Sequence, residues 1–71
     1  EAARPLAPAL REALLFDNSL LRRAAAEILG DVDPGADETM ERLRTIARND
    51  PDAIARREAR LALRKLAARG G

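Results

Sequence analysis

Side chains that could carry out chemistry are scarce in this sequence. The 71 residues contain no histidine, no cysteine and no tyrosine, and Ser19 is the only serine. Nucleophilic catalysis needs a base beside the nucleophile, and no candidate base shares a motif with Ser19. Ser19 instead follows Asp17 and Asn18, at a point where the N-terminal cap of a helix is expected. The sequence therefore predicts a protein that is not an enzyme, and it excludes a zinc site built from Cys or His.

Acidic residues cluster in the middle of the chain and could bind a hard cation. An EF-hand loop places a glycine five positions after its first ligand, and Gly35 does not keep that spacing from Asp31 or Asp33. Acidic side chains near the start of a helix also complement the positive end of its dipole. We therefore predict no metal site and no cofactor at this cluster, which comprises Asp31, Asp33, Asp37, Glu38 and Glu41.

Arginine gives the strongest candidate for binding. The net charge is only +1, but residues 1–41 carry four Arg against nine Asp and Glu, whereas residues 42–71 carry eight Arg and one Lys against three acids. Arg57, Arg60 and Arg64 follow spacings of three and four residues, so they share one face of a helix. Such a face could bind carboxylates of a protein or phosphates of a nucleic acid, or it could be a solvated surface.

Two helices are expected in the first half of the chain. The first runs from about residue 6 to the cluster Asp17-Asn18-Ser19, which ends it and supplies N-cap candidates for the second. The second runs to about Gly30, a residue that suits a C-terminal cap. Apolar residues at spacings of three and four predict one buried stripe on each helix. The stripes are Leu6, Leu10, Ala13 and Leu14 in the first helix, and Leu21, Ala25, Ile28 and Leu29, widened by Leu20 and Ala24, in the second.

Two further helices are expected after a loop at residues 31–35. The third helix begins at Pro34 or Asp37. Asp50 as N-cap and Pro51 as the first helical residue start the fourth, which extends to about residue 69. The apolar stripes are Ala36, Met40, Leu43, Ile46 and Ala47 in the third helix, and Ala55, Ala59, Ala62, Leu63 and Leu66, with a second stripe of Ile54 and Leu61, in the fourth.

The second half of the chain repeats the first. At an offset of 33 residues, Leu10, Leu14 and Asp17 align with Leu43, Ala47 and Asp50. At an offset of 34, Arg22, Ala25, Ile28, Leu29 and Val32 align with Arg56, Ala59, Ala62, Leu63 and Leu66. Each unit is therefore a helix, a tight turn that contains Asp, and a second helix. A period in the thirties built from helix pairs is typical of an α-solenoid.

These units resemble HEAT repeats of the short bacterial type. The first unit reads Asp17, Arg22, Ala25, Ala26, Ile28, Leu29 and Gly30, and the second reads Asp50, Pro51, Arg56, Ala59, Ala62 and Leu63. The resemblance covers about residues 6–69, and it implies that Asp17, Arg22, Asp50 and Arg56 form a structural ladder between repeats. Two residues depart from the pattern, because Arg60 and Arg64 stand where a small residue and a glycine are expected.

We therefore expect one all-α domain over residues 1–71, with repeat one at 6–33 and repeat two at 34–69. The fold is expected to be four helices in two antiparallel αα-hairpins, a HEAT-like α-solenoid fragment, and the alternative is a compact four-helix bundle. Two repeats are fewer than the three or more that usually bury a continuous core. The chain is then a fragment, a capping pair or a protein that self-associates.

The expected function is that of a non-catalytic scaffold for protein–protein interaction. The partner, for which an acidic protein is one candidate, would bind the surface of the second and fourth helices through Arg23, Glu27, Arg57, Arg60 and Arg64. One alternative is a nucleic-acid-binding module that uses the Arg-rich last helix. Another is a docking or oligomerisation domain of a larger protein. No apolar run approaches the ~20 residues that span a bilayer, so we expect a soluble, cytoplasmic protein without membrane contact.

Overall fold

The computed structural model describes residues 6–70, and almost all of them are helical. The helices are α1 (Leu6–Ala13), α2 (Ser19–Val32), α3 (Asp37–Asn49) and α4 (Ala53–Gly70). No strand occurs within this range, so the predicted all-α fold is confirmed. The side chain of Leu6, expected in the first apolar stripe, lies outside what the structure describes.

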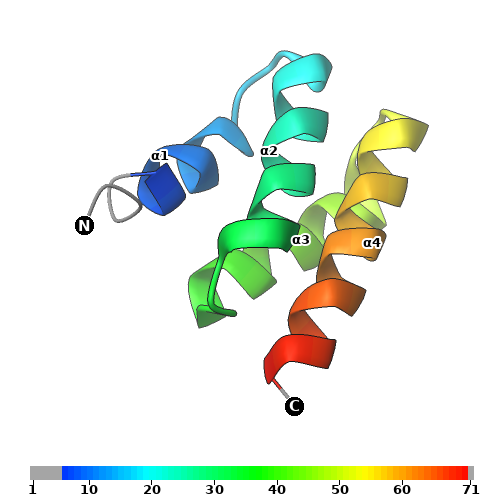
Figure 1. Ribbon diagram of the computed structural model, residues 1–71. Coiled ribbons are helices and arrows are strands. Elements are labelled where there is room, and N and C mark those ends of the chain that lie inside the picture. The colour runs from blue at the N-terminus through cyan, green and yellow to red at the C-terminus, as the bar shows by residue number, and fades with distance from the viewer. Residues whose placement is uncertain (1–5, 71) are drawn as a thin grey trace.

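The helices form two successive hairpins. In Figure 1, α2 and α4 lie side by side and run in the same direction, α3 lies behind α4, and α1 leaves α2 at an angle. The most extensive helix packing is between α2 and α4, then α3 and α4, then α1 and α2. The second helices of the hairpins thus stack as in an α-solenoid, rather than closing a four-helix bundle.

The turn between α1 and α2 differs from the prediction in two respects. Helix α1 ends at Ala13, well before the predicted cluster, and the chain turns over the next residues. Asn18, and not Ser19, is the N-cap of α2. Its side-chain oxygen accepts hydrogen bonds from the backbone N–H groups of Leu20 and Leu21, 2.9 and 3.3 Å long. Ser19 is the first helical residue, so the hydroxyl is not needed to start the helix.

Gly30 does not end α2, contrary to the prediction. The helix continues to Val32, and Asp33 is its C-cap. Gly30 is buried against α4, and a Cβ atom added there would lie 3.0 Å from both the Cα and the Cβ of Ala62. Glycine is therefore required for close helix–helix approach and not for a left-handed cap. The predicted loop is correspondingly shorter, at residues 33–36.

The start of α4 also differs from the prediction. Asp50 is the C-cap of α3, and α4 begins at Ala53 rather than at Pro51. The Asp52 carboxylate accepts a 2.7 Å hydrogen bond from the backbone N–H of Ala55 and so acts as the N-terminal cap. The Asp50 carboxylate accepts a 2.9 Å hydrogen bond from the N–H of Asp52, which fixes the turn.

The core lies between the hairpins and is built mostly from leucine and alanine. Its buried residues are Leu14, Ala25, Ala26, Leu29, Leu43, Ile46, Ala55, Ala59, Ala62 and Leu66. The predicted main stripe of α4 is confirmed, and that of α3 is confirmed apart from Ala36, which is the N-cap of α3 and not part of the core. Met40, Ala47 and Leu63 pack against this core. The predicted stripe of α2 is wrong in part. Leu21 and Ile28 remain 44% and 39% exposed, and the buried face of α2 is turned toward Ala26 and Gly30.

Candidate partner-binding site

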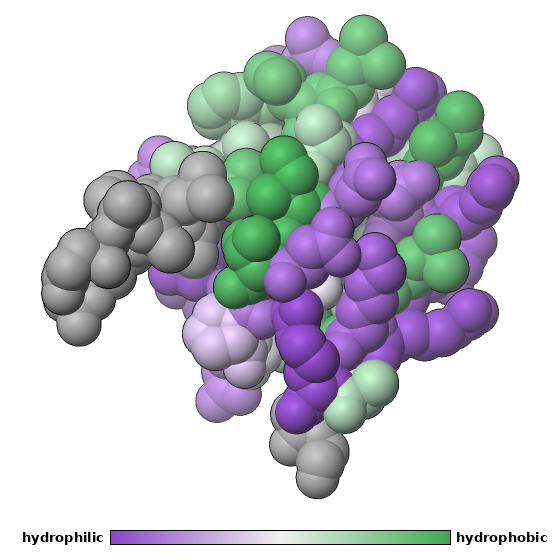
Figure 2. All heavy atoms as spheres, viewed as in Figure 1, coloured by the Kyte–Doolittle hydropathy of each residue, from purple (hydrophilic) through white to green (hydrophobic). Residues whose placement is uncertain are grey.

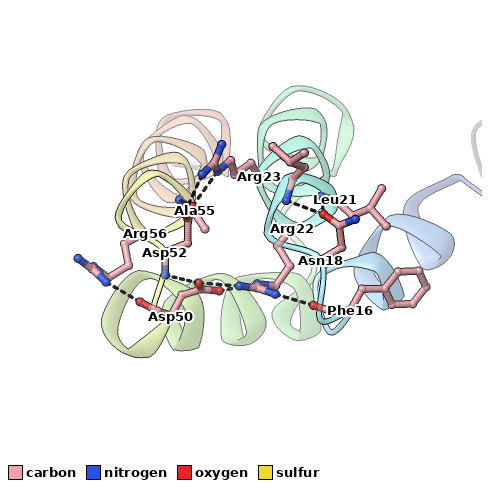
Figure 3. A network of polar contacts seen from close by, with 10 residues as sticks. Phe16, Asn18, Leu21, Arg22, Arg23, Asp50, Asp52, Ala55 and Arg56 are labelled. Atoms are coloured by element: carbon pink, nitrogen blue, oxygen red, sulfur yellow. Dashed lines mark hydrogen bonds and ion pairs between the residues drawn. The ribbon is translucent and has the colours of Figure 1, made fainter.

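Arg22 connects the two hairpins. Its Nε and one terminal nitrogen donate hydrogen bonds of 2.7 and 3.0 Å to the two carboxylate oxygens of Asp50. The other terminal nitrogen donates a 2.7 Å bond to the backbone oxygen of Phe16 (Figure 3). The hydrogen bonds from Arg22 lower the pKa of Asp50, in opposition to the burial of that carboxylate. These hydrogen bonds from Arg22 join the turn before α2 to the turn before α4.

Arg23 makes a second connection beside the first. Its guanidinium donates two hydrogen bonds, 2.8 and 2.7 Å long, to the Asp52 carboxylate. These bonds, together with the N–H of Ala55, lower the pKa of Asp52 from 3.8 to about 2. Arg23 is one of the residues predicted to contact a partner, and in the structure its guanidinium binds a carboxylate of the same chain. The sequence patterns did not identify Asp52 as a residue of this network. The signal that could have identified it is its position two residues after Asp50, together with the adjacent pair Arg22 and Arg23.

Arg56 continues the ladder on the far side of Asp50. One of its terminal nitrogens donates a 2.6 Å hydrogen bond to the backbone oxygen of Asp50. This contact repeats the bond from Arg22 to Phe16 at the offset of 34 residues (Figure 3). Arg22, Asp50 and Arg56 thus form a ladder, as the sequence predicted. Asp17 is exposed, and no hydrogen bond or ion pair joins it to another residue in the range 6–70.

Asp33 organises a second polar centre between α1, α2 and α3. Its side chain is fully buried and accepts hydrogen bonds from the Thr39 hydroxyl (3.0 Å) and from Arg11 (3.3 Å). It also accepts bonds of 2.8 and 2.9 Å from the backbone N–H groups of Gly35 and Ala36, which lead into α3. From the sequence, Asp33 is expected only as part of a loop. Its role as a buried hydrogen-bond acceptor also depends on Arg11, which comes from α1 and is distant in the sequence.

Most of the remaining cations are also engaged within the molecule. Arg42 donates to the backbone oxygen of Arg11 and pairs with Glu38 at 2.8 Å. Lys65 pairs with Asp31 at 3.0 Å, which ties the end of α4 to α2. The other engaged groups are Arg44, with Glu41, and Arg69, with the backbone oxygens of Asp31 and Asp33.

Three arginines on α4 stand apart from these networks. Arg57, Arg60 and Arg64 are exposed, and within residues 6–70 no carboxylate lies within ion-pairing distance of them. Their spacing places them along one side of the helix. We call Arg57, Arg60 and Arg64 the arginine stripe. The structure thus leaves these predicted site residues with their guanidinium groups available to an external anion.

Exposed apolar side chains accompany the arginine stripe. Ile54 and Leu61 are 45% and 39% exposed on α4, and Leu20 is 64% exposed on α2. The offset of 34 pairs Leu20 with Ile54 and Glu27 with Leu61, so these residues occupy matching positions on adjacent parallel helices. We call Leu20, Glu27, Ile54 and Leu61 the α2–α4 face. Glu27, a predicted site residue, is exposed there without a charge partner in the described chain.

The described chain has few features that suggest other kinds of site. A hollow of about 180 Å³ lies between α3 and the turn that follows α1, lined by Leu14, Leu15, Arg42, Thr45 and Ile46. Within residues 6–70, no three acidic side chains lie close enough together to hold a metal ion. None of the helices in this range combines the length and apolar character that a membrane span requires.

Comparison with protein families agrees with this architecture. A family model described as HEAT repeats matches residues 2–64. The chain belongs to the HEAT-repeat family. Comparisons with curated proteins and with solved structures gave no match. The hairpins α1–α2 and α3–α4 are thus two stacked HEAT repeats, and the ladder of Arg22, Asp50 and Arg56 joins them. HEAT repeats generally mediate protein–protein interaction and are typically not catalytic.

Proposed function

We propose that this HEAT-repeat protein is a non-catalytic interaction module that binds an acidic protein partner through the arginine stripe and the adjoining α2–α4 face. The observation that supports this most strongly is the distribution of arginine contacts. Arg22, Arg23 and Arg56 are held by groups of the same chain, whereas the arginine stripe is exposed and has no such partner among the described residues.

The mixture of side chains favours a protein partner over a nucleic acid. Leu61 lies one helical turn from Arg57 and from Arg64, so apolar and cationic groups alternate on the same part of α4. Protein interfaces are enriched in arginine and apolar side chains, and the fork of arginine binds carboxylates with two hydrogen bonds. Binding of single-stranded nucleic acid commonly uses stacking aromatics, and Phe16, the only aromatic residue, lies in the turn between α1 and α2 and not on α4.

Within this proposal the five predicted residues have unequal roles. Arg57, Arg60 and Arg64 contact the acidic groups, and Glu27 lies on the α2–α4 face where a partner's cation could approach. Arg23 acts indirectly, because its bidentate bond to Asp52 fixes the start of α4. The cytoplasmic location expected from the sequence belongs to this proposal as well.

A binding assay with matched charge variants tests the proposal. A labelled helical peptide with Glu at spacings of three and four residues and Leu between them is titrated with the protein, and anisotropy is followed at about 50 and 200 mM salt. Arg60→Gln/Arg64→Gln is compared with Arg44→Gln/Arg48→Gln, which removes the same charge at the same spacing from an exposed face of α3. We expect at least about a tenfold loss of affinity for the first pair, corresponding to about 1.4 kcal/mol, and little change for the second.

Labelled duplex and single-stranded DNA are titrated in the same way. Phosphate contacts lose affinity steeply between these salt concentrations. Saturable DNA binding that is tighter than peptide binding, and that is lost in Arg60→Gln/Arg64→Gln, would replace the acidic protein with a nucleic acid as the partner. Equal effects of the two variant pairs on the peptide would contradict the proposal, because the binding would then depend on net charge alone.

The exposed apolar residues of the α2–α4 face support docking or oligomerisation as a second candidate. Ile54 and Leu61 are large and partly exposed, and Ile54→Asp or Leu61→Asp would dissociate an oligomer formed through this face. Sedimentation velocity over a hundredfold concentration range separates the two cases. A monomer at all concentrations supports binding of a different protein, and a dimer that either substitution dissociates supports self-association.

A further inference from the structure

The repeat itself shows which surfaces should be covered when another repeat stacks. The offset of 34 residues pairs Leu21, Ala25, Ile28 and Val32 of α2 with Ala55, Ala59, Ala62 and Leu66 of α4. On α4 these four residues are between 0% and 2% exposed, because α2 and α3 cover them. On α2 only Ala25 is buried, and Leu21, Ile28 and Val32 are 44%, 39% and 48% exposed. We call these three exposed residues the α2 edge.

Hydrophobic residues gather where the α2 edge lies. Figure 2 shows a continuous hydrophobic patch over α2 on the side of α1, whereas the surface over α4 is mostly hydrophilic. Leu21 and Ile28 of the α2 edge also belong to the apolar stripe that sequence periodicity predicts to be buried. A stripe with the period of a buried face that nevertheless remains exposed indicates that its covering element is supplied by another segment or molecule.

The opposite edge of the module does not have this character. The stacking of α4 on α2 depends on Ala26, which is fully buried, and on Gly30, whose position leaves no space for a Cβ. At the equivalent positions α4 carries Arg60 and Arg64, both exposed. A helix cannot approach α4 as closely as α4 approaches α2 without burying two unpaired guanidinium groups. We therefore call the α4 side of the solenoid closed, because a further helix cannot stack there as closely, and the α2 side open.

We infer that the α2 edge binds one further helical hairpin, whose second helix has small residues at two positions four apart and an arginine one turn before them. This is the chemistry of α2 itself, which presents Ala26, Gly30 and Arg22 to α4. The required arginine has an acceptor at the α2 edge. Asp17 is exposed in the turn before α2, at the offset of 33 from Asp50, which accepts Arg22 in the observed stack.

A second copy of this chain does not meet these requirements. Stacked head to tail, it would offer α4, which has Arg60 and Arg64 where small residues are needed. Paired edge to edge, it would offer a second Asp17 in place of the arginine. Leu21 and Ile28 are also larger than their counterparts Ala55 and Ala62, so the incoming helix must have small side chains to reach the turn that carries Asp17. The partner is thus a different hairpin of the same architecture.

A fusion protein tests this directly. A copy of residues 6–36, which brings α1, α2 and the loop that follows α2, is placed ahead of Glu1 of the full chain. The added copy of α2 then presents Ala26, Gly30 and Arg22 to the α2 edge. We expect a single thermal transition with a midpoint at least about 10 °C above that of the parent, because stacked repeats gain a new interface and unfold together.

The control fusion carries Ala26→Arg and Gly30→Arg in the added copy only, which reproduces the arrangement at α4. We expect its midpoint to equal that of the parent. The chain has no native cysteine, so Ile28→Cys in the original repeat reports coverage of the α2 edge through its rate of reaction with a thiol reagent. This rate should fall at least about tenfold in the first fusion and remain that of the parent in the control.

Three results would overturn the inference. The two fusions could have the same midpoint and the same labelling rate, which would mean that the α2 edge does not recognise small residues. The unfused Ile28→Cys protein could label more slowly as its concentration rises, which would identify a second copy as the occupant. A copy of residues 34–69 placed after Gly71 could stabilise the chain as much as the first fusion, which would mean that α4 is not a closed edge.

Discussion

The guanidinium of Arg22 and the carboxylate of Asp50 are joined by two hydrogen bonds, 2.7 and 3.0 Å long, although the residues lie 28 positions apart in the sequence. Arg22 is 12% exposed and Asp50 5% exposed at the side chain. Because Arg22 also donates to the backbone oxygen of Phe16, one side chain fixes three chain segments. The stacking of the two HEAT repeats therefore depends on a polar contact as well as on the small residues between α2 and α4.

Arg22→Lys should destabilise the protein although it preserves the charge. A lysine ammonium cannot donate to both oxygens of Asp50 and to Phe16 at once, because it lacks the planar fork of arginine. We expect a lower urea midpoint for unfolding followed by circular dichroism. Arg44→Lys is the matched control, since Arg44 is 52% exposed and its one ion pair within residues 6–70 is with Glu41. Equal midpoints for the two variants would show that the Arg22 contact does not contribute to stability.

The stability should also depend on pH through Asp52. Its pKa is lowered from 3.8 to about 2, first by the hydrogen bonds from Arg23 and then by the N–H of Ala55. A carboxyl group whose pKa is lower in the folded state stabilises the fold above its unfolded pKa, and this contribution is lost as the pH falls through the folded pKa. The urea midpoint should therefore decline between about pH 4 and pH 2.

Asp52→Asn separates this effect from helix capping. Asparagine also caps helices, as Asn18 does at the equivalent position before α2. We expect the variant to be less stable at pH 7 and its midpoint to fall less steeply between pH 4 and pH 2. Arg23→Gln removes the same pair from the other side and should flatten the profile in the same way. A profile in either variant as steep as that of the parent would assign the acid sensitivity to other groups.

Gly30→Ala should lower the stability, against the usual preference of helices for alanine. Alanine gains about 1 kcal/mol in helix propensity, but the new Cβ would lie 3.0 Å from Ala62 and force α4 away. Overpacking of this kind costs about 1–3 kcal/mol, so we expect a net loss of about 1 kcal/mol and a thermal midpoint lower by about 4–8 °C. In an Ala62→Gly background the same substitution should be less harmful, and a raised midpoint in the parent would contradict the packing argument.

The periodic pattern and the repeat were sufficient to predict the helices, their stacking and part of the ladder. Leu43 and Ala59 could be assigned to the core because they lie at helical spacing from other apolar residues. Arg22 and Asp50 could be assigned to the ladder because Arg and Asp recur at fixed places in the two units. The local signals at helix ends were less informative. Gly30 was interpreted as a cap because glycine suits a left-handed residue, but its position is determined by the approach of α4, which no local pattern reveals.

The candidate site could be predicted only for residues that make no internal contact. Arg23 and Arg57 occupy equivalent positions in the two repeats, and the sequence treats them alike. They differ because Asp52 of the following repeat lies beside Arg23, whereas no following repeat lies beside Arg57 in the described chain. The same reason explains why Leu21 and Ile28 are exposed. Their pattern predicts burial, and whether they are buried depends on a neighbour outside the repeat.

Thr39 should be important for stability through its hydroxyl group. The hydroxyl donates to Asp33 at 3.0 Å and accepts from Arg11 at 3.1 Å, and the residue is fully buried. Thr39→Val keeps the shape but leaves the buried carboxylate with one donor fewer, which should cost about 2 kcal/mol. Thr39→Ser keeps the hydroxyl and removes one methyl group, which should cost about 1 kcal/mol. Chemical denaturation measures both, and a greater loss for the serine variant would show that packing matters more than the hydrogen bonds.

Ala26 and Arg60 occupy the same position in the two repeats, but Ala26→Arg and Arg60→Ala should have very different effects on stability. Ala26 is fully buried against α4, so Ala26→Arg places a charged side chain where there is neither space nor an acceptor. We expect it to separate the two hairpins and abolish cooperative unfolding, because overpacking and an unpaired buried charge act together. Arg60 is exposed, so Arg60→Ala should change the stability by no more than about 0.5 kcal/mol. Differential scanning calorimetry of both variants checks this contrast. A native-like transition for Ala26→Arg would mean that α2 and α4 tolerate a wider separation, and that Arg60 and Arg64 do not close the solenoid at α4.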